Sequence, residues 1–131
     1  MAKLFTREEA EALLPKIEPL LQEIQELGHE IAEHEAHLQV DQTKLMSNGH
    51  KPPADTETLQ NEVRTLNRRI RANVDAILAM GVIVKDLTEG LIDFPSLLHG
   101  REVYLCWRLG EDGIHWWHEI EGGFAGRQPL D

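Results

Sequence analysis

The residues of this chain best suited to chemistry stand near its C-terminal end, in the segment 114–121, which is IHWWHEIE. These eight residues include two histidines, two tryptophans and two glutamates. Imidazole and carboxylate groups bind transition metals and transfer protons near neutral pH. The segment therefore indicates either a metal-binding or catalytic site, or a strand whose large side chains pack against the rest of the protein.

His118 is the leading candidate in this segment, and Glu119 is the second. Successive side chains of a strand point to opposite faces, so His115 and His118 cannot bind one metal ion together if the strand is regular. The Asp112-Gly113 pair predicts a hairpin with a two-residue or a four-residue loop, and both registers place His118 on the apolar face that packs on helices. There His118 is either a core histidine with a hydrogen-bonding partner, or a general acid–base group or metal ligand.

The opposite face of the predicted sheet is the other candidate for a ligand site. It collects Cys106, Arg108 and Trp117, and we expect Asp93 and Arg127 nearby, where the sheet meets the helices. An arginine can bind a carboxylate or phosphate through two parallel hydrogen bonds, and a tryptophan can stack on a ligand. Cysteine, histidine and glutamate also form a zinc set, although the paired-cysteine spacing of zinc sites is absent. The alternative is a solvated face held by arginine–glutamate pairs.

A second group of metal-binding residue types lies in GHEIAEHEAHLQ, at residues 28–39. His34 and His37 are three residues apart, so both lie on one face of a helix, beside Glu30 and Glu33. A di-metal carboxylate site in a helical bundle would need matching ligands from other helices, and the second predicted helix has no histidine. A solvated acidic, histidine-rich helix face is the alternative.

Two long helices must position these groups. The pattern FTREEAEALL begins a helix over residues 6–45, with Thr6 as N-cap and Glu9 completing a capping box. Pro15 and Pro19 predict a kink or a delayed start near them. Residues 46–55 form a loop, and a second helix covers 56–80. Apolar residues recur at alternating steps of four and three in both helices, which predicts an antiparallel, coiled-coil-like hairpin.

After the second helix the apolar period changes to two, which predicts a small antiparallel β-meander over residues 82–121, followed by a glycine-rich tail over 122–131. The fold class is therefore α+β, and the 131 residues are expected to form a single domain.

The bulk composition restricts the partners. A net charge of -10 argues against nucleic acid and against an anionic membrane surface, and no apolar run is long enough to span a bilayer. The single cysteine cannot form an internal disulfide, and the N-terminal segment is unlike a signal peptide, so a cytoplasmic location is expected.

The segments GLIDFPSLLHGREVYLCWRLGE and WHEIEGGFAGRQPL resemble a family of small bacterial proteins known as domain of unknown function 2203. The likeness is specific over residues 92–130, and the helical half fits the general layout of the family. The matching positions are Asp93, Phe94, Pro95, Cys106, Trp107, Arg108, Glu111, Trp117, His118, Phe124, Gly126 and Arg127. The family has no established activity, so the resemblance implies a fold and the neighbourhood of a site but no reaction.

Two functions are compatible with these patterns. The first is a non-enzymatic, self-associating interaction module, expected as a homodimer that buries the remaining apolar stripe of the hairpin and also able to bind a protein partner. The second is a metal- or anion-binding enzyme with a site at the junction of hairpin and sheet, in which His118 is the acid–base group or ligand. A divalent transition metal is the cofactor that this second hypothesis implies.

Overall fold

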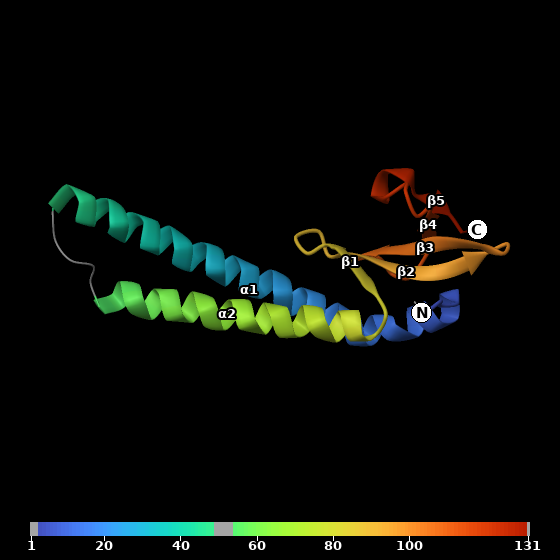
Figure 1. Cartoon of the computed structure of the whole chain (residues 1–131), viewed down its shortest axis with the longest axis horizontal. Helices are drawn as coiled ribbons and strands as arrows, with labels where there is room; N and C mark the ends of the chain where they lie inside the picture. Colours follow the sequence, from blue (N-terminus) through green and yellow to red (C-terminus); the bar gives the residue numbers. More distant parts are fainter. Residues whose placement is uncertain (1–2, 49–53, 131) are drawn as a thin grey trace.

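The computed structural model describes residues 3–48 and 54–130, with the side chains of 38–55 left undescribed. A long helical hairpin carries a small sheet at one end, and both ends of the described chain lie at the sheet end (Figure 1). This arrangement confirms the predicted α+β class, with the hairpin first and an antiparallel meander after it. No helix among the described residues is long and apolar enough to cross a membrane.

Helix α1 spans Arg7–Asn48 and begins at the predicted capping box. The backbone N–H of Thr6 donates to Glu9 Oε1 at 2.9 Å, and the backbone N–H of Glu9 donates to Thr6 Oγ1 at 3.1 Å. Helix α1 continues through Pro15 and Pro19, so the predicted delayed start is wrong. Both prolines lie on the exposed side of the helix, where water can bond the carbonyls that lose their helical partners.

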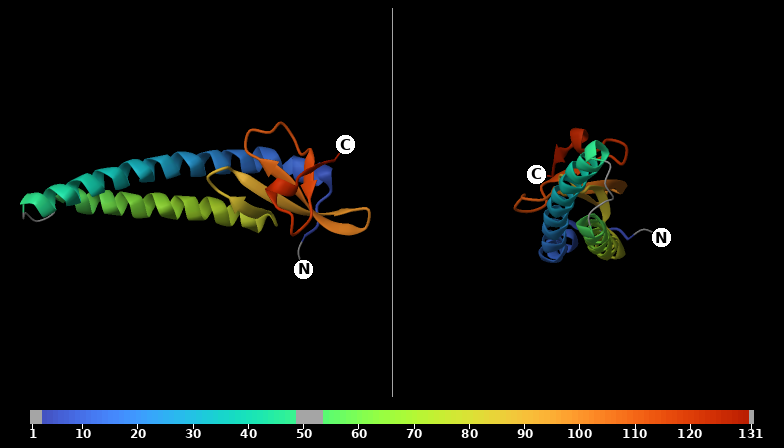
Figure 2. Two further views of the ribbon diagram at one scale, coloured as in Figure 1. Left: turned by 90° about the horizontal axis from the view of Figure 1, so that it is seen from above. Right: turned by 90° about the vertical axis from the view of Figure 1, so that its left-hand side faces the viewer.

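Helix α2 spans Ala54–Ala79 and runs antiparallel to α1 (Figure 2). The direction follows from two contacts: Glu23 pairs with Arg69 at 2.5 Å, whereas His34, further along α1, lies 3.3 Å from Glu62, which is earlier in α2. The predicted boundaries, 6–45 and 56–80, differ by a few residues from those observed. The predicted loop at 46–55 includes residues 49–53, which lie outside the described residues.

Five strands follow in the order of the sequence, each antiparallel to its neighbour. They are β1 (Ile83–Asp86), β2 (Leu91–Leu98), β3 (Arg101–Arg108), β4 (Trp116–His118) and β5 (Gln128–Pro129). A short 3-10 helix, η1 (Phe124–Gly126), precedes β5. The glycine-rich tail thus folds back over the sheet and pairs the two residues of β5 with β4.

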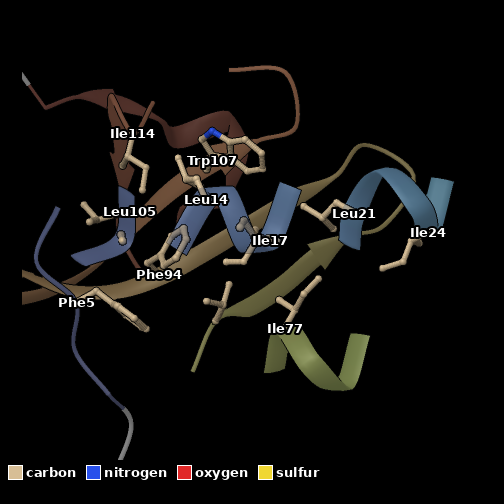
Figure 3. Packing of buried hydrophobic residues seen from close by; sticks show 13 residues of the cluster. Phe5, Leu14, Ile17, Leu21, Ile24, Ile77, Phe94, Leu105, Trp107 and Ile114 are labelled. Carbon is tan, nitrogen blue, oxygen red and sulfur yellow. The ribbon is translucent and has the colours of Figure 1, made fainter. Parts of the chain in front are cut away.

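The hydrophobic core lies between one face of the sheet and the first half of α1 (Figure 3). From α1 come Leu14, Ile17 and Leu21, and from the sheet come Phe94 and Trp107, all buried. Phe94 and Trp107 alternate along their strands with residues of the opposite face. The helices thus cover only one face of the sheet, and the chemistry-bearing residues of β2 and β3 lie on the other.

Candidate functional site

His118 lies on the face of the sheet opposite to the helices, which corrects the predicted face. In the observed register, Tyr104 pairs with His118 and Leu105 pairs with Trp117. Paired residues share a face, so His118 joins Tyr104, and Trp117 packs against the core beside Leu105. This register differs by an odd number of residues from both predicted ones, and an odd shift exchanges the two faces of a strand.

The physical reason for the difference is the connection between β3 and β4. Residues 109–115 link the two strands as an irregular loop, and the Asp112-Gly113 pair forms no tight hairpin turn. The loop is held by its own contacts: Ile114 is buried in the core, and the indole N–H of Trp107 donates to the Glu111 carbonyl at 3.2 Å. These contacts set the length of the loop and hence the register of β4.

The register brings together three side chains from three strands: Asp93 of β2, Cys106 of β3 and His118 of β4. Asp93 and Cys106 are direct cross-strand partners, and His118 sits beside them, opposite Tyr104. One potential ligand atom from each of the three residues lies within 4.8 Å of the other two, and this is the single group of that kind in the part of the chain that the structure describes. All three residues are at most 1% exposed.

The hydrogen bonds of His118 leave one of its nitrogens facing an acceptor. Nδ1 lies 2.7 Å from the Glu119 carbonyl oxygen, which can only accept, so Nδ1 carries a proton. Nε2 lies 3.0 Å from Asp93 Oδ1. In a neutral imidazole this Nε2 would present a lone pair to a carboxylate oxygen, which is repulsive. The contact is favourable only if a cation, either a proton or a metal ion, is shared between the two atoms.

The second oxygen of Asp93 has a different environment. Oδ2 is buried and has no hydrogen-bond partner among the described residues. Lys85 Nζ lies 4.0 Å from Oδ2, which is beyond hydrogen-bonding distance. A buried carboxylate oxygen without a hydrogen bond costs free energy unless a ligand binds it.

Cys106 completes the group as a protonated thiol. Burial raises the pKa of Cys106 to about 11, and the nearby Arg127 guanidinium only partly opposes this effect. The three residue types are those of a cysteine–histidine–aspartate catalytic triad, but the geometry is different, because both ring nitrogens of His118 already contact oxygen atoms. Neither nitrogen is available to take the thiol proton, so the described arrangement does not activate Cys106 as a nucleophile.

The C-terminal segment covers this face through Arg127. Its guanidinium forms two hydrogen bonds with the carboxylate of Glu111, at 3.0 Å and 2.6 Å, and donates to the Cys106 carbonyl at 3.4 Å. It also contacts two aromatic rings, with its central carbon 5.3 Å from the centre of the Trp116 ring and 4.6 Å from that of Phe124. Arg127 therefore anchors the tail over the sheet rather than presenting a free anion site.

The other residues singled out from the sequence have different surroundings. Glu119 pairs with Arg101 at 2.5 Å, and Arg108 forms an ion pair with Glu89. Trp117 packs against the core. His34 lies 3.3 Å from Glu62 and His37 is exposed, and neither belongs to a group of three potential metal ligands in the described part of the chain. Asp93 and His118 were expected to lie near each other where the sheet meets the helices, whereas the place of Cys106 beside them was missed, because it depends on the cross-strand registers.

The fold and the site define a small α+β protein in which a helical hairpin supports a sheet with a buried aspartate–cysteine–histidine group. The chain belongs to the family described as an uncharacterized conserved protein, domain of unknown function 2203, whose model matches residues 3–130. Comparisons with curated proteins and with solved structures found no significant match.

Proposed function

We propose that this protein binds a divalent transition metal ion through Asp93, Cys106 and His118. The observation that carries the proposal is the contact between His118 Nε2 and Asp93 Oδ1, at 3.0 Å, while Nδ1 is committed to a carbonyl. Nε2 and Oδ1 need a cation shared between them, and a metal ion can supply it in place of a proton. The unpartnered Asp93 Oδ2 and the adjacent thiol supply further ligand atoms for the same ion.

The ligand types select the class of metal. Imidazole and thiolate favour zinc and similar transition ions, whereas magnesium and calcium prefer all-oxygen sites. One thiolate and one carboxylate would neutralise a divalent ion, so the buried group would carry no net charge. Because the pKa of Cys106 is raised to about 11, binding must displace the thiol proton, as is usual when a metal binds cysteine.

The proposed role of the ion is structural. Structural zinc sites have four protein donor atoms, whereas catalytic ones keep a position open to substrate; here both oxygens of Asp93 can complete a set of four with Cys106 and His118, and the three residues are at most 1% exposed. An ion held by them would fasten β4 to β2 and β3 beneath the C-terminal segment. This role fits a non-enzymatic module better than an enzyme, since acid–base catalysis by His118 requires contact with a substrate.

Metal analysis tests the proposal. The wild-type chain, loaded with Zn²⁺ or Co²⁺ and desalted, is expected to retain one equivalent, and the Co²⁺ form is expected to show a thiolate charge-transfer band. His118→Ala is expected to lose the ion, and Cys106→Ser to lose the band. His115→Ala is the matched control, because His115 is exposed and contacts Asp112 rather than the group. Equal retention by wild type and His118→Ala, or no binding by wild type, would contradict the proposal.

Self-association is a second candidate function, and we propose it for the hairpin. Beyond the sheet α1 and α2 have only each other to pack against (Figure 1). Leu59 and Val63 of α2 remain only half-buried there, and nearer the sheet Ile70 and Val74 are also half-buried, although they pack against the edge of the core. A second copy of the chain would cover this line in a four-helix arrangement.

Light scattering tests self-association. The wild-type protein should have the mass of two chains, and Val63→Glu should have the mass of one. A wild-type mass of one chain would exclude the proposal.

A further inference from the structure

Lys85 stands at an irregular position of β1, next to the proposed metal ligands. The register of β1 with β2 pairs Val84 with Ile92 and then Asp86 with Leu91, so Lys85 falls in the bulge between these pairs. Bulges change the direction of a side chain and are frequent beside functional sites. The ammonium of Lys85 lies 4.0 Å from Asp93 Oδ2 and 5.2 Å from the centre of the Tyr104 ring.

Lys85 and Asp93 differ sharply in exposure. The side chain of Lys85 is 41% exposed, whereas that of Asp93 is 1% exposed. A lysine has a long flexible stem and a strongly hydrated head, so moving its ammonium into water requires no rearrangement of the sheet. Asp93 cannot move away in the same way. Lys85 is thus a mobile cation beside a fixed, buried carboxylate.

The other nearby cation is held in place. Arg127 is committed to Glu111 and to the Cys106 carbonyl, with its side chain only 14% exposed. Among the described residues beside the group, Lys85 is therefore the one whose charged side chain can readily move away from Asp93. Tyr104, whose ring lies 5.6 Å from that of His118, is also partly exposed on this side of the group.

We infer that Lys85 sets the metal affinity of this site by competing with the ion for Asp93 Oδ2. The inference rests on the proposed metal-binding function. Without an ion, the ammonium partly compensates the buried carboxylate. When an ion binds, it takes the same oxygen, and the repulsion between two cations drives the lysine head into solvent. Lys85 is accordingly an affinity-setting residue and not a ligand.

The inference predicts that removing the charge tightens binding. Lys85→Met keeps an apolar stem over Tyr104 and removes the ammonium, so the dissociation constant for Zn²⁺ should fall about tenfold, a modest change because water screens an exposed charge. Lys85→Arg keeps the charge and should bind like wild type. Lys16→Met is the matched control: it removes one exposed positive charge from α1, which packs on the opposite face of the sheet.

A competition titration of Zn²⁺ against a chromogenic chelator, at low and at high salt, measures these affinities. The inference is supported if Lys85→Met binds Zn²⁺ more tightly than wild type while Lys16→Met binds it with unchanged affinity. The difference in affinity between Lys85→Met and wild type should shrink in high salt. If wild type binds Zn²⁺ and Lys85→Met binds it equally well, the inference is wrong and the metal proposal stands. If neither binds, the metal proposal itself fails. Binding by Lys85→Met alone would support the competition but contradict metal binding by the natural chain.

Discussion

Replacing Asp93 with alanine is expected to lower the free energy of unfolding of the metal-free protein by about 3–5 kcal/mol. Asp93 and His118 form a buried pair at 3.0 Å, and each side chain is 1% exposed. Without the carboxylate, His118 must either carry an uncompensated buried charge or give up its proton and leave Nε2 without a partner. Urea denaturation in the presence of a chelator, followed by circular dichroism, measures the loss.

The chain offers a matched control for this prediction. His115 and Asp112 form an aspartate–histidine pair of similar length, 2.8 Å, but the Asp112 side chain is 93% exposed. Asp112→Ala should therefore cost less than about 1 kcal/mol, because water screens and solvates the pair. The double variant Asp93→Ala/His118→Ala should lose less unfolding free energy than the two single variants lose in total. If Asp93→Ala and Asp112→Ala lost the same unfolding free energy, burial of the Asp93–His118 pair would make no difference to stability.

Gly90→Ala is expected to reduce the free energy of unfolding by about 2–4 kcal/mol, since two penalties add. Gly90 has φ +68°, a conformation that costs a residue with a Cβ roughly 1–2 kcal/mol. A Cβ at this position would also lie 2.6 Å from the Cβ of Leu109, so the backbone of β2 or of the loop after β3 must shift. Thermal or urea unfolding of the variant measures the effect.

Gly100→Ala separates the two penalties. Gly100 has φ +79°, but an added Cβ there would meet no atom within 4 Å. The unfolding free energy lost by Gly100→Ala should therefore be limited to the conformational cost of roughly 1–2 kcal/mol. A Gly90→Ala variant no less stable than Gly100→Ala would mean that β2 and the 109–115 loop are packed more loosely than the structure shows. Since β2 carries Asp93, a shifted β2 should also weaken Zn²⁺ binding.

Local patterns in the sequence were sufficient to predict the elements. The four-and-three spacing of apolar residues predicted both long helices to within a few residues, because a helix exposes one face every three to four residues. The capping box at Thr6 and Glu9 marked the start of α1. The alternating pattern after Gly81 predicted a meander, and the α+β class follows from that order of elements.

The site was predictable only in part. The types and spacing of residues identified His118 and Asp93 as candidates, but they also suggested Arg108, Trp117 and Glu119, which the structure places in ion pairs or in the core. Sequence alone cannot show which exposed charge will find a partner, since the partners come from other elements: Glu89 from the turn between β1 and β2, and Arg101 from β3.

The face on which His118 lies was decided by the tertiary structure alone. Strand alternation relates residues within β4, but the assignment of β4 to the faces of the sheet depends on its register with β3. That register follows from the irregular 109–115 loop, whose contacts with the core no local pattern encodes. The sequence by itself determined the elements and the residue types, whereas the pairing of three strands determined that Asp93, Cys106 and His118 meet in one buried group.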